Sequence, residues 1–457
     1  MTTSQLPIAV IGAGPVGLAA AAHLIARGEQ PIVFEAGASV AASMRSWGHV
    51  RTFSPWKYLV DSAARNLLEP RGWQLATPEA APTGAELVDG YLQPLAEIPA
   101  IANSLRLGSR VTGIARLGFD KMKTAGREDA PFLIRYQDAG GDTQTVVARA
   151  VIDASGTYSS PNPLGASGVP AIGEEAAASR ITYRIPDVLD RDRERFAGKR
   201  VLVVGAGHSA FNALLELAEL QRTEPTTAIT WAIRSTPDPN MFGGGSSDAL
   251  PLRGALGDAM RALVDEGRLT FVSGFPITEV RRSDATVSVV SGDREIGPFD
   301  EIVCTTGFRP DLSLMRELRV ELDPAVEAPP MLAPLIDPNL HSCGTVPPHG
   351  SRELRHPEAG FYIVGMKSYG RAPTFLMLTG YEQVRSVVAE IVGDHEAARS
   401  VMLELPETGV CSTGGPELPD GASASAACCG SSPSSVIALD EVNERVAVGV
   451  GARSSCG

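Results

Sequence analysis

The fold of this 457-residue chain is decided by the stretch Ile8-Ala-Val-Ile-Gly12-Ala-Gly14-Pro-Val-Gly17. An alanine- and leucine-rich segment follows as far as Arg27, and a second apolar run at residues 31–34 ends beside Glu35. A strand, a glycine-rich turn, a helix and a second strand in this order predict a parallel βαβ unit of the Rossmann type. The predicted fold class is therefore α/β.

Each glycine of this turn has a separate structural role. Gly12 permits the tight turn, Gly14 lets the backbone approach a diphosphate, and Gly17 lets the helix and strand pack closely. The helix N-terminus supplies free N–H groups and a partial positive charge, and Glu35 lies where a carboxylate accepts hydrogen bonds from ribose hydroxyls. The residues predicted to bind this first dinucleotide are Gly12, Ala13, Gly14, Pro15, Gly17 and Glu35.

A near copy of the unit starts with the apolar run at residues 199–204. It continues into Gly205-Ala-Gly207-His-Ser, a predicted helix as far as residue 220, and a predicted strand at 228–233. That strand ends at Arg234, where the first copy has Glu35. A guanidinium binds a 2′-phosphate in a bidentate manner, so the exchange favours NADPH over NADH. The residues predicted to bind this second dinucleotide are Gly205, Gly207, His208, Ser209 and Arg234.

Two of these residues also have simpler interpretations. Arg234 could merely solvate the end of its strand. His208, at the start of the predicted helix, could make a local hydrogen bond instead of touching a phosphate.

Composition excludes several classes of partner. The chain carries 40 Lys and Arg against 53 Asp and Glu, a formal net charge of −13, which repels nucleic-acid backbones. The longest apolar stretch, residues 7–26, is interrupted by glycines, a proline and a histidine, so we predict no membrane span. No Lys or Arg precedes Arg27, which argues against a secretory signal, and we expect a cytoplasmic protein.

Two dinucleotide sites in one chain indicate an electron path from a nicotinamide to a flavin. With the further segments at 151–157, 301–311 and 360–365, the chain resembles the two-dinucleotide-binding flavoprotein superfamily. That group includes flavin-containing monooxygenases, N-hydroxylating monooxygenases and thioredoxin reductases. The resemblance implies FAD in the first site and NADPH in the second, with two Rossmann-like domains.

The resemblance also implies a discontinuous FAD domain into which the NADPH domain is inserted. We predict FAD-domain halves at 1–165 and 299–404, an NADPH domain at 166–298 and a tail at 405–457. Further residues expected near the flavin are Arg45, Trp47, Gly365 and Gln383, with Tyr369 and Arg371 in the same segment.

A finer resemblance rests on residues 47–51, 53–56, 368–386 and 405–411, which are similar to flavoproteins encoded in bacterial arsenic-resistance clusters. It implies a monooxygenase that uses molecular oxygen to oxidise a small, soft nucleophile, a trivalent arsenical. The expected partners are therefore a small molecule and oxygen, and a homodimer is left open. No catalytic residue is assigned, because the cofactor carries the chemistry.

One departure from the monooxygenase pattern keeps other functions open. The segment ahead of the second glycine turn keeps Tyr183 but lacks the usual histidine. An NADPH-dependent reductase of a disulfide or quinone is one alternative, although the NADPH domain has no CxxC for thioredoxin-reductase chemistry. A binding protein that senses arsenic or redox state is the other.

After Pro406 the composition shifts to Gly, Ser, Ala and Pro, which predicts a flexible tail. The tail carries Cys411, the vicinal pair Cys428 and Cys429, and Cys456. Thiolates suit soft ions such as trivalent arsenic, so these cysteines are candidates for capturing an arsenical, with inert cysteines as the alternative. No other metal site is predicted.

Overall fold

The computed structural model describes residues 5–403, apart from residues 76, 238–240, 244, 246–247, 249, 341–345 and 374. The chain divides into two units, residues 1–415 and 416–457. The predicted tail at 405–457, with Cys411, Cys428 and Cys429, lies outside the described residues.

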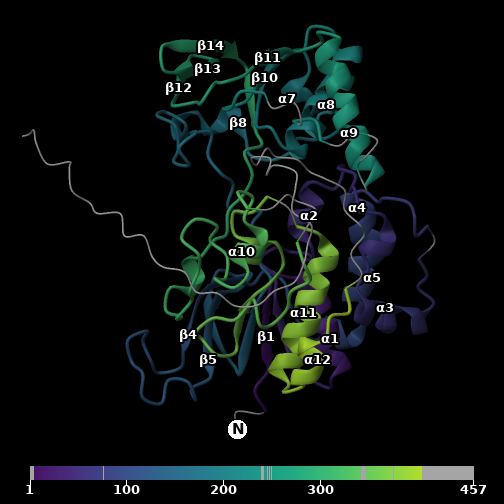
Figure 1. The fold of residues 1–457 in the computed structure, drawn as a ribbon, viewed down its shortest axis with the longest axis vertical. Helices are drawn as coiled ribbons and strands as arrows, with labels where there is room; N and C mark the ends of the chain where they lie inside the picture. Colours follow the sequence, from purple (N-terminus) through teal and green to yellow (C-terminus); the bar gives the residue numbers. More distant parts are fainter. Residues whose placement is uncertain are drawn as a thin grey trace, which may run out of the picture. The chain divides into compact units, whose positions relative to one another are not determined.

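The first sheet has five parallel strands in the order β16-β7-β1-β2-β3. Its central strand, β1, is labelled in Figure 1. The strands that were expected from the glycine turn form its centre, with Ile8 paired to both Pro31 and Ala150. The strands span β1 (Ile8–Ile11), β2 (Pro31–Phe34), β3 (Leu105–Arg106), β7 (Ala150–Asp153) and β16 (Phe361–Ile363).

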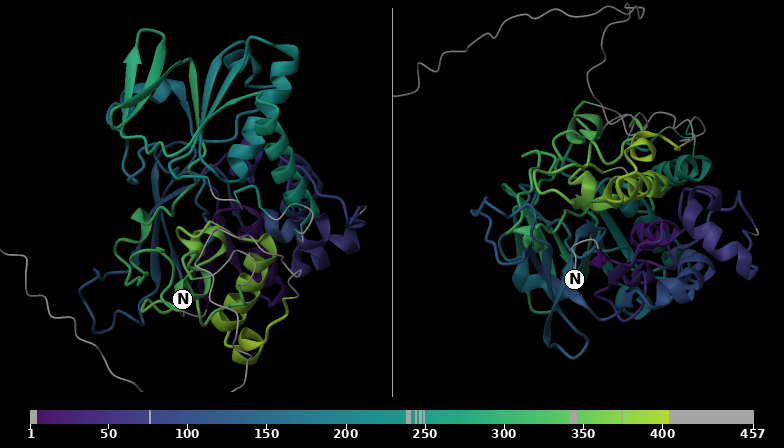
Figure 2. Two further views of the ribbon diagram at one scale, coloured as in Figure 1. Left: turned by 45° about the horizontal axis from the view of Figure 1, so that its top comes forward. Right: turned by 90° about the horizontal axis from the view of Figure 1, so that it is seen from below.

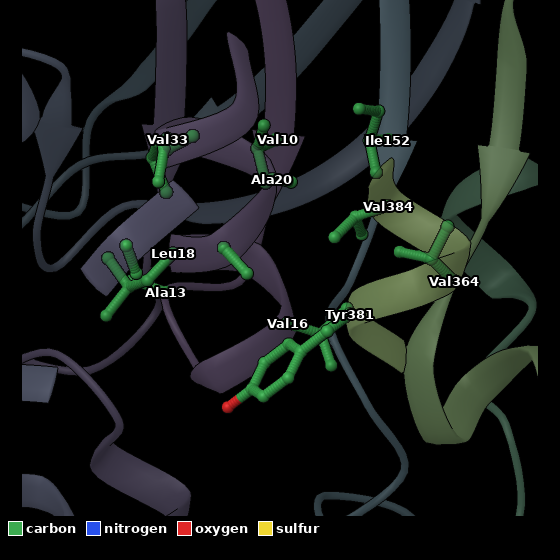
Figure 3. Close-up of a cluster of buried hydrophobic side chains, with 14 of the residues drawn as sticks. Val10, Ala13, Val16, Leu18, Ala20, Val33, Ile152, Val364, Tyr381 and Val384 are labelled. Carbon is green, nitrogen blue, oxygen red and sulfur yellow. The ribbon is translucent and has the colours of Figure 1, made fainter. Parts of the chain in front are cut away.

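Alternate side chains of β1 enter two different cores, because successive residues of a strand point to opposite faces. Ile8 and Val10 pack against helices α1 (Pro15–Ala26) and α11 (Met377–Ile391), and Figure 3 shows part of this cluster. Ala9 and Ile11 pack on the other face, against an antiparallel sheet. That sheet consists of β4 (Arg110–Arg116), β5 (Phe132–Gln137) and β6 (Thr143–Ala148).

Short helical segments fill the connection between β2 and β3. Their apolar side chains, such as Leu87, Tyr91 and Leu95, join the core around α1. The segments are α2 (Ala42–Ser46), η2 (Trp56–Tyr58), α3 (Ser62–Leu68), η3 (Glu69–Arg71), α4 (Gly84–Leu87), the π-helical turn η4 (Val88–Leu92), α5 (Gln93–Ala96) and α6 (Pro99–Ala102).

The second sheet repeats the Rossmann arrangement, with strand order β11-β10-β9-β15-β8. Its strands span β8 (Ile181–Thr182), β9 (Arg200–Val204), β10 (Ala228–Ala232), β11 (Thr270–Val272) and β15 (Glu301–Cys304). Helices α8 (His208–Thr223) and α9 (Pro251–Asp265) lie side by side against this sheet (Figure 2). A three-stranded antiparallel sheet follows α9, formed by β12 (Glu279–Ser283), β13 (Thr286–Ser291) and β14 (Arg294–Phe299).

The pairing of β15 shifts the predicted boundary between the NADPH domain and the second half of the FAD domain. Residues 299–404 were expected to belong to the FAD domain, yet Glu301 pairs with Val201 and Cys304 with Val204, inside the second sheet. The apolar strand at 301–304 is buried on both faces, so it fits between β8 and β9 of that sheet. The chain returns to the first domain only after β15.

The remaining segments connect these layers. They are η5 (Glu175–Arg180), α7 (Arg193–Phe196), η7 (Ser313–Met315), α10 (Ala333–Ile336), η8 (Gly365–Tyr369) and α12 (His395–Arg399). Within the described part of the chain, none of the helices combines the length and the apolar character that a membrane span requires.

Candidate cofactor sites

The first glycine turn is fixed by the packing of the protein itself. Gly12 has a φ of +96°, and a Cβ placed on it would lie 2.7 Å from the carbonyl oxygen of Ala154, just beyond β7. A Cβ on Gly17 would lie 1.9 Å from the carbonyl oxygen of Gly12. Any side chain at either position would therefore push the turn away from the helix or the strand.

Gly14 is different, because a Cβ there would meet none of the described atoms within 4 Å. It is the N-cap of α1, with Pro15 as the first helical residue and no acidic residue in the first turn. Free helix N–H groups beside an open glycine suit a diphosphate, which needs close backbone approach and a positive dipole end. The residues of this turn fit the diphosphate of FAD.

Glu35 is tied to the turn by two hydrogen bonds. Its Oε2 accepts from the backbone N–H of Ala13 at 2.9 Å, and its Oε1 accepts from that of Gly37 at 2.8 Å. The carboxylate thus positions the glycine turn relative to β2. Both oxygens keep further lone pairs for the predicted ribose hydroxyls.

The second glycine turn has the same construction. Gly205 has a φ of +135°, and a Cβ there would lie 2.5 Å from the carbonyl oxygen of Thr305, just beyond β15. Gly207 is the N-cap of α8, and a Cβ on it would meet nothing within 4 Å among the described residues. Ser209 in the first turn of α8 and Arg234 after β10 are both exposed. This turn fits a second dinucleotide.

His208, the first residue of α8, packs against the first domain. Its ring lies 5.1 Å from that of Phe53, centroid to centroid. Burial lowers the pKa of His208, and the nearby Arg253 guanidinium acts in the same direction. The imidazole is therefore neutral near pH 7, and it touches a domain interface in addition to lying beside the predicted phosphate site.

A buried polar contact lies further along α8. His49 Nε2 is 3.7 Å from Glu216 Oε2, too far for a hydrogen bond, and neither atom has a hydrogen-bond partner among the described residues. Burial raises the pKa of Glu216 to about 7, and the charge of Asp187 adds to this effect. Burial lowers the pKa of His49 against the opposing influence of Asp187.

The structure gives Arg45 and Trp47 partners within the first domain. Arg45 donates to Asp89 Oδ1 at 2.9 Å and to Gln93 Oε1 at 3.3 Å, in η4 and α5. Trp47 lies against α4, where a Cβ placed on Gly84 would be 2.8 Å from the indole ring. Both residues therefore fix α2 to the helical connection.

The predicted flavin segment that contains Gly365 packs closely against α1. Gly365 has a φ of +69°, and a Cβ placed on it would lie 3.3 Å from Val16 in the first turn of α1. Gln383 in α11 is fully buried, and its Oε1 accepts from the Gly365 N–H at 2.7 Å. Gln383 thus fixes the backbone at Gly365. Arg371, predicted in the same region, forms an ion pair with Glu327 at 3.0 Å.

Sequence reasoning missed the ion pair between Lys367 in η8 and Asp153 at the end of β7. Lys367 Nζ lies 2.7 Å from Asp153 Oδ2 and 3.1 Å from the hydroxyl of Ser155. The available signal was a carboxylate ending an apolar strand and a lone lysine in a segment of apolar and small residues. Nothing in the sequence connects the two across more than 200 residues.

The described residues contain no cluster of three or more His, Cys, Asp or Glu side chains that could hold a metal ion. Cys304 in β15 is buried, and burial raises the pKa of its thiol to about 11. A thiol of this kind is unreactive near neutral pH.

Comparisons with known proteins agree with this architecture. Residues 10–76 match an NAD(P)-binding Rossmann-like domain, and residues 137–332 match the pyridine nucleotide-disulphide oxidoreductase family. The chain is 29% identical over 240 residues to the indole-3-pyruvate monooxygenase YUCCA1 of Oryza sativa, a match that covers 51% of this chain and 50% of that protein. The chain therefore spans about half the length of this curated relative.

Solved structures of similar fold include a bacillithiol disulfide reductase from Bacillus cereus, with a TM-score of 0.63 and 18% identity over 86% of this chain and 99% of that one. A flavin-containing monooxygenase from Stenotrophomonas maltophilia has a TM-score of 0.54 and 21% identity over 85% and 98%. The predicted fold class is confirmed, as are the two cofactors at the level of FAD and NAD(P).

Proposed function

We propose that this chain, a two-dinucleotide-binding-domain flavoprotein, is an NADPH-dependent monooxygenase that oxidises a small, soft nucleophile, and that a trivalent arsenical is its substrate. The observation that carries the redox part of the proposal is the pair of complete glycine turns, each at the carboxyl edge of its own parallel sheet. A pure binding protein has no need of a second nucleotide.

In this proposal the backbone around Gly14 and the N-terminus of α1 bind the FAD diphosphate, with Glu35 at the ribose. Gly207 and the N-terminus of α8 bind the NADPH diphosphate, and the exposed Arg234 takes the 2′-phosphate. Bound FAD would supply the acceptance of hydride and the reaction with oxygen. The protein's part is to bind, to orient and to exclude water.

Two chain segments connect the sheets, one leaving the first sheet after β7 and one returning to it after β15. The outgoing and returning segments pair through the Asn162 N–H and the Gly307 carbonyl at 2.9 Å, and through the Arg309 N–H and the Ser160 carbonyl at 2.9 Å. Gly307 has a φ of +92°, so the returning segment turns where only glycine is comfortable. Because residues 160–162 and 307–309 are hydrogen-bonded to each other, the two connecting segments resist moving independently.

The substrate part of the proposal rests on the resemblance of residues 47–51, 53–56, 368–386 and 405–411 to flavoproteins of arsenic-resistance clusters. It is tested by measuring NADPH consumption by the purified yellow protein, with and without a trivalent methylarsenical, while oxygen and peroxide are followed. Faster consumption with a pentavalent product in place of peroxide supports it. Turnover to peroxide regardless of the arsenical overturns the substrate and leaves the flavin chemistry standing.

The tail cysteines are proposed to capture the arsenical. The support is their clustering and the affinity of thiolates for soft ions. We expect the variant in which Cys411, Cys428 and Cys429 are replaced by Ser to bind the arsenical more weakly and to keep its NADPH oxidation. Unchanged arsenical affinity in this triple variant would remove the capture step from the proposal.

A disulfide reductase is the second candidate, favoured by the match of residues 137–332 to the disulphide oxidoreductase family. Against a dithiol mechanism, the one cysteine among the described residues is the buried Cys304. Anaerobic NADPH consumption on adding a low-molecular-weight disulfide, with release of free thiol, would favour this candidate. The monooxygenase requires oxygen for product formation, so the two readouts separate the candidates.

A further inference from the structure

The backbone N–H and the backbone carbonyl of Gly365 are both hydrogen-bonded to buried side chains. Its N–H donates to Gln383 Oε1 at 2.7 Å, and its carbonyl accepts from the Ser368 hydroxyl at 2.8 Å. Gln383 Nε2 donates in turn to Ser368 Oγ at 3.0 Å, and it lies 2.9 Å from His349 Nε2. Four residues thus form one closed set of hydrogen bonds.

The donors and acceptors of this set fix the tautomer of His349. The N–H of Gly365 assigns Oε1 of Gln383 as the acceptor, so the other amide atom is the NH₂ group, which only donates. His349 Nε2 must therefore accept, and the ring proton is on Nδ1, from which it donates to the Pro347 carbonyl at 3.0 Å. A protonated imidazole would point an N–H at the amide N–H of Gln383, and the contact would become repulsive.

The surroundings keep this imidazole neutral. His349 is buried, which lowers its pKa, and the ring lies 5.6 Å from that of Tyr369. The carboxylates of Glu353 and Glu382 oppose this effect without cancelling it. Glu353 accepts from the Gly350 N–H at 3.0 Å, and Glu382 pairs with Arg385 at 2.7 Å, so each of these charges has its own partner.

The set reaches the FAD site through Val16. This residue lies in the first turn of α1, two positions after Gly14, and it packs directly against Gly365. A Cβ on Gly380, in α11, would also lie 2.7 Å from Val16. A displacement of the Gly365 peptide therefore moves the first turn of α1, where the diphosphate of FAD is expected.

We infer that His349 is a positioning residue for FAD, which acts through Gln383 to hold the Gly365 peptide against α1 and does so only while its imidazole is neutral. Acid should accordingly loosen FAD binding. The inference concerns the binding of FAD and is independent of the substrate proposed above.

The test is the FAD dissociation constant of the purified holoenzyme, followed by flavin fluorescence on dilution, at pH 7.5 and at an acid pH at which the ¹⁵N shifts of the wild type show His349 protonated. For the wild type we expect the constant to rise about fivefold or more at the acid pH, the effect of losing one net hydrogen bond. His349→Gln offers an acceptor that does not titrate, so it should bind within about twofold of wild type at pH 7.5 and show a smaller acid effect. His349→Leu should bind more weakly at both pH values.

His356→Gln is the matched control. His356 is a second buried histidine with a pKa lowered to about 4, and it bonds the Glu321 carbonyl instead of the Gly365 set. This variant should keep the acid effect of the wild type. If His349→Gln also keeps the full acid effect, or if His349→Leu binds FAD like wild type, the inference is wrong.

A measurement on the wild type covers the case in which a variant fails to fold. The ¹⁵N shifts of the ring nitrogens in the holoenzyme report the tautomer, and we expect an unprotonated Nε2 on His349 at pH 7.5. A protonated Nε2 would overturn the inference without any substitution.

Discussion

Lys367 and Asp153 form an ion pair in which neither side chain is exposed, with Nζ 2.7 Å from Oδ2. The pair joins η8 to the carboxyl end of β7, the strand that also supports Gly12 of the first glycine turn. Ser155 completes it, since its N–H and its hydroxyl both donate to Asp153 Oδ1. Lys367, Asp153 and Ser155 thus provide hydrogen-bond partners for one another at the edge of the sheet where FAD is expected.

Removing one partner of this pair should be costly. Lys367→Met leaves the Asp153 carboxylate buried without its counter-charge, a change that typically costs about 3–5 kcal/mol of unfolding free energy. Urea denaturation with and without FAD measures the loss. As a control, Lys57→Met breaks the solvent-exposed pair with Glu79 and should change the unfolding free energy far less than Lys367→Met does. Equal effects of the two substitutions would show that burial does not set the strength of the inner pair.

The glycines of the first turn should separate folding from cofactor binding. Gly17→Ala forces a methyl group into the Gly12 carbonyl and should destabilise the protein by more than about 1 kcal/mol. Gly14→Ala meets no described atom within 4 Å, so the apoprotein should keep its stability, while the methyl group blocks the diphosphate. The checks are thermal unfolding of the apoprotein and FAD titration. A Gly14→Ala protein that binds FAD like wild type would contradict the assignment of this turn.

Arg234 should decide between the two nicotinamide coenzymes. A guanidinium bound to a 2′-phosphate makes charged hydrogen bonds, each worth about 1.5–3 kcal/mol, so Arg234→Ser should raise the KM for NADPH by about tenfold or more. The KM for NADH should stay nearly constant, because NADH lacks that phosphate. Steady-state NAD(P)H oxidation by the holoenzyme measures both. Parallel changes in the two constants would instead indicate that Arg234 only solvates the end of β10.

Local sequence predicted those parts of the molecule in which neighbouring residues decide the structure. The turns around Gly12 and Gly205, their helices and the flanking strands are confirmed, because glycine spacing and apolar runs specify a βαβ unit directly. The strand at 301–304 was placed in the wrong domain, since an apolar run does not reveal which sheet it joins. The partners of Lys367 and His349 depend on contacts between distant segments, and no pattern in the sequence links them.

Glu216 should make stability depend on pH at the contact between α8 and the first domain. Burial raises the folded pKa of Glu216 from its ordinary 4.5 to about 7, so its contribution to stability is complete below pH 4.5 and is lost as the pH rises through 7. Glu216→Gln removes this titration and should raise the unfolding free energy at pH 8 by about 1–3 kcal/mol, with little change at pH 4.5.

The measurement is the urea midpoint of wild type and Glu216→Gln at several pH values between 4.5 and 8. His49 contributes in the opposite direction, because its lowered pKa gives stability that is lost as the pH falls below 6.5, so the difference between the two proteins is the quantity to compare. Glu219→Gln on the same helix is the control, since Glu219 is exposed and should leave the wild-type pH profile unchanged. A constant difference between wild type and Glu216→Gln across this range would mean that Glu216 does not titrate near neutrality, and that water reaches the contact with His49.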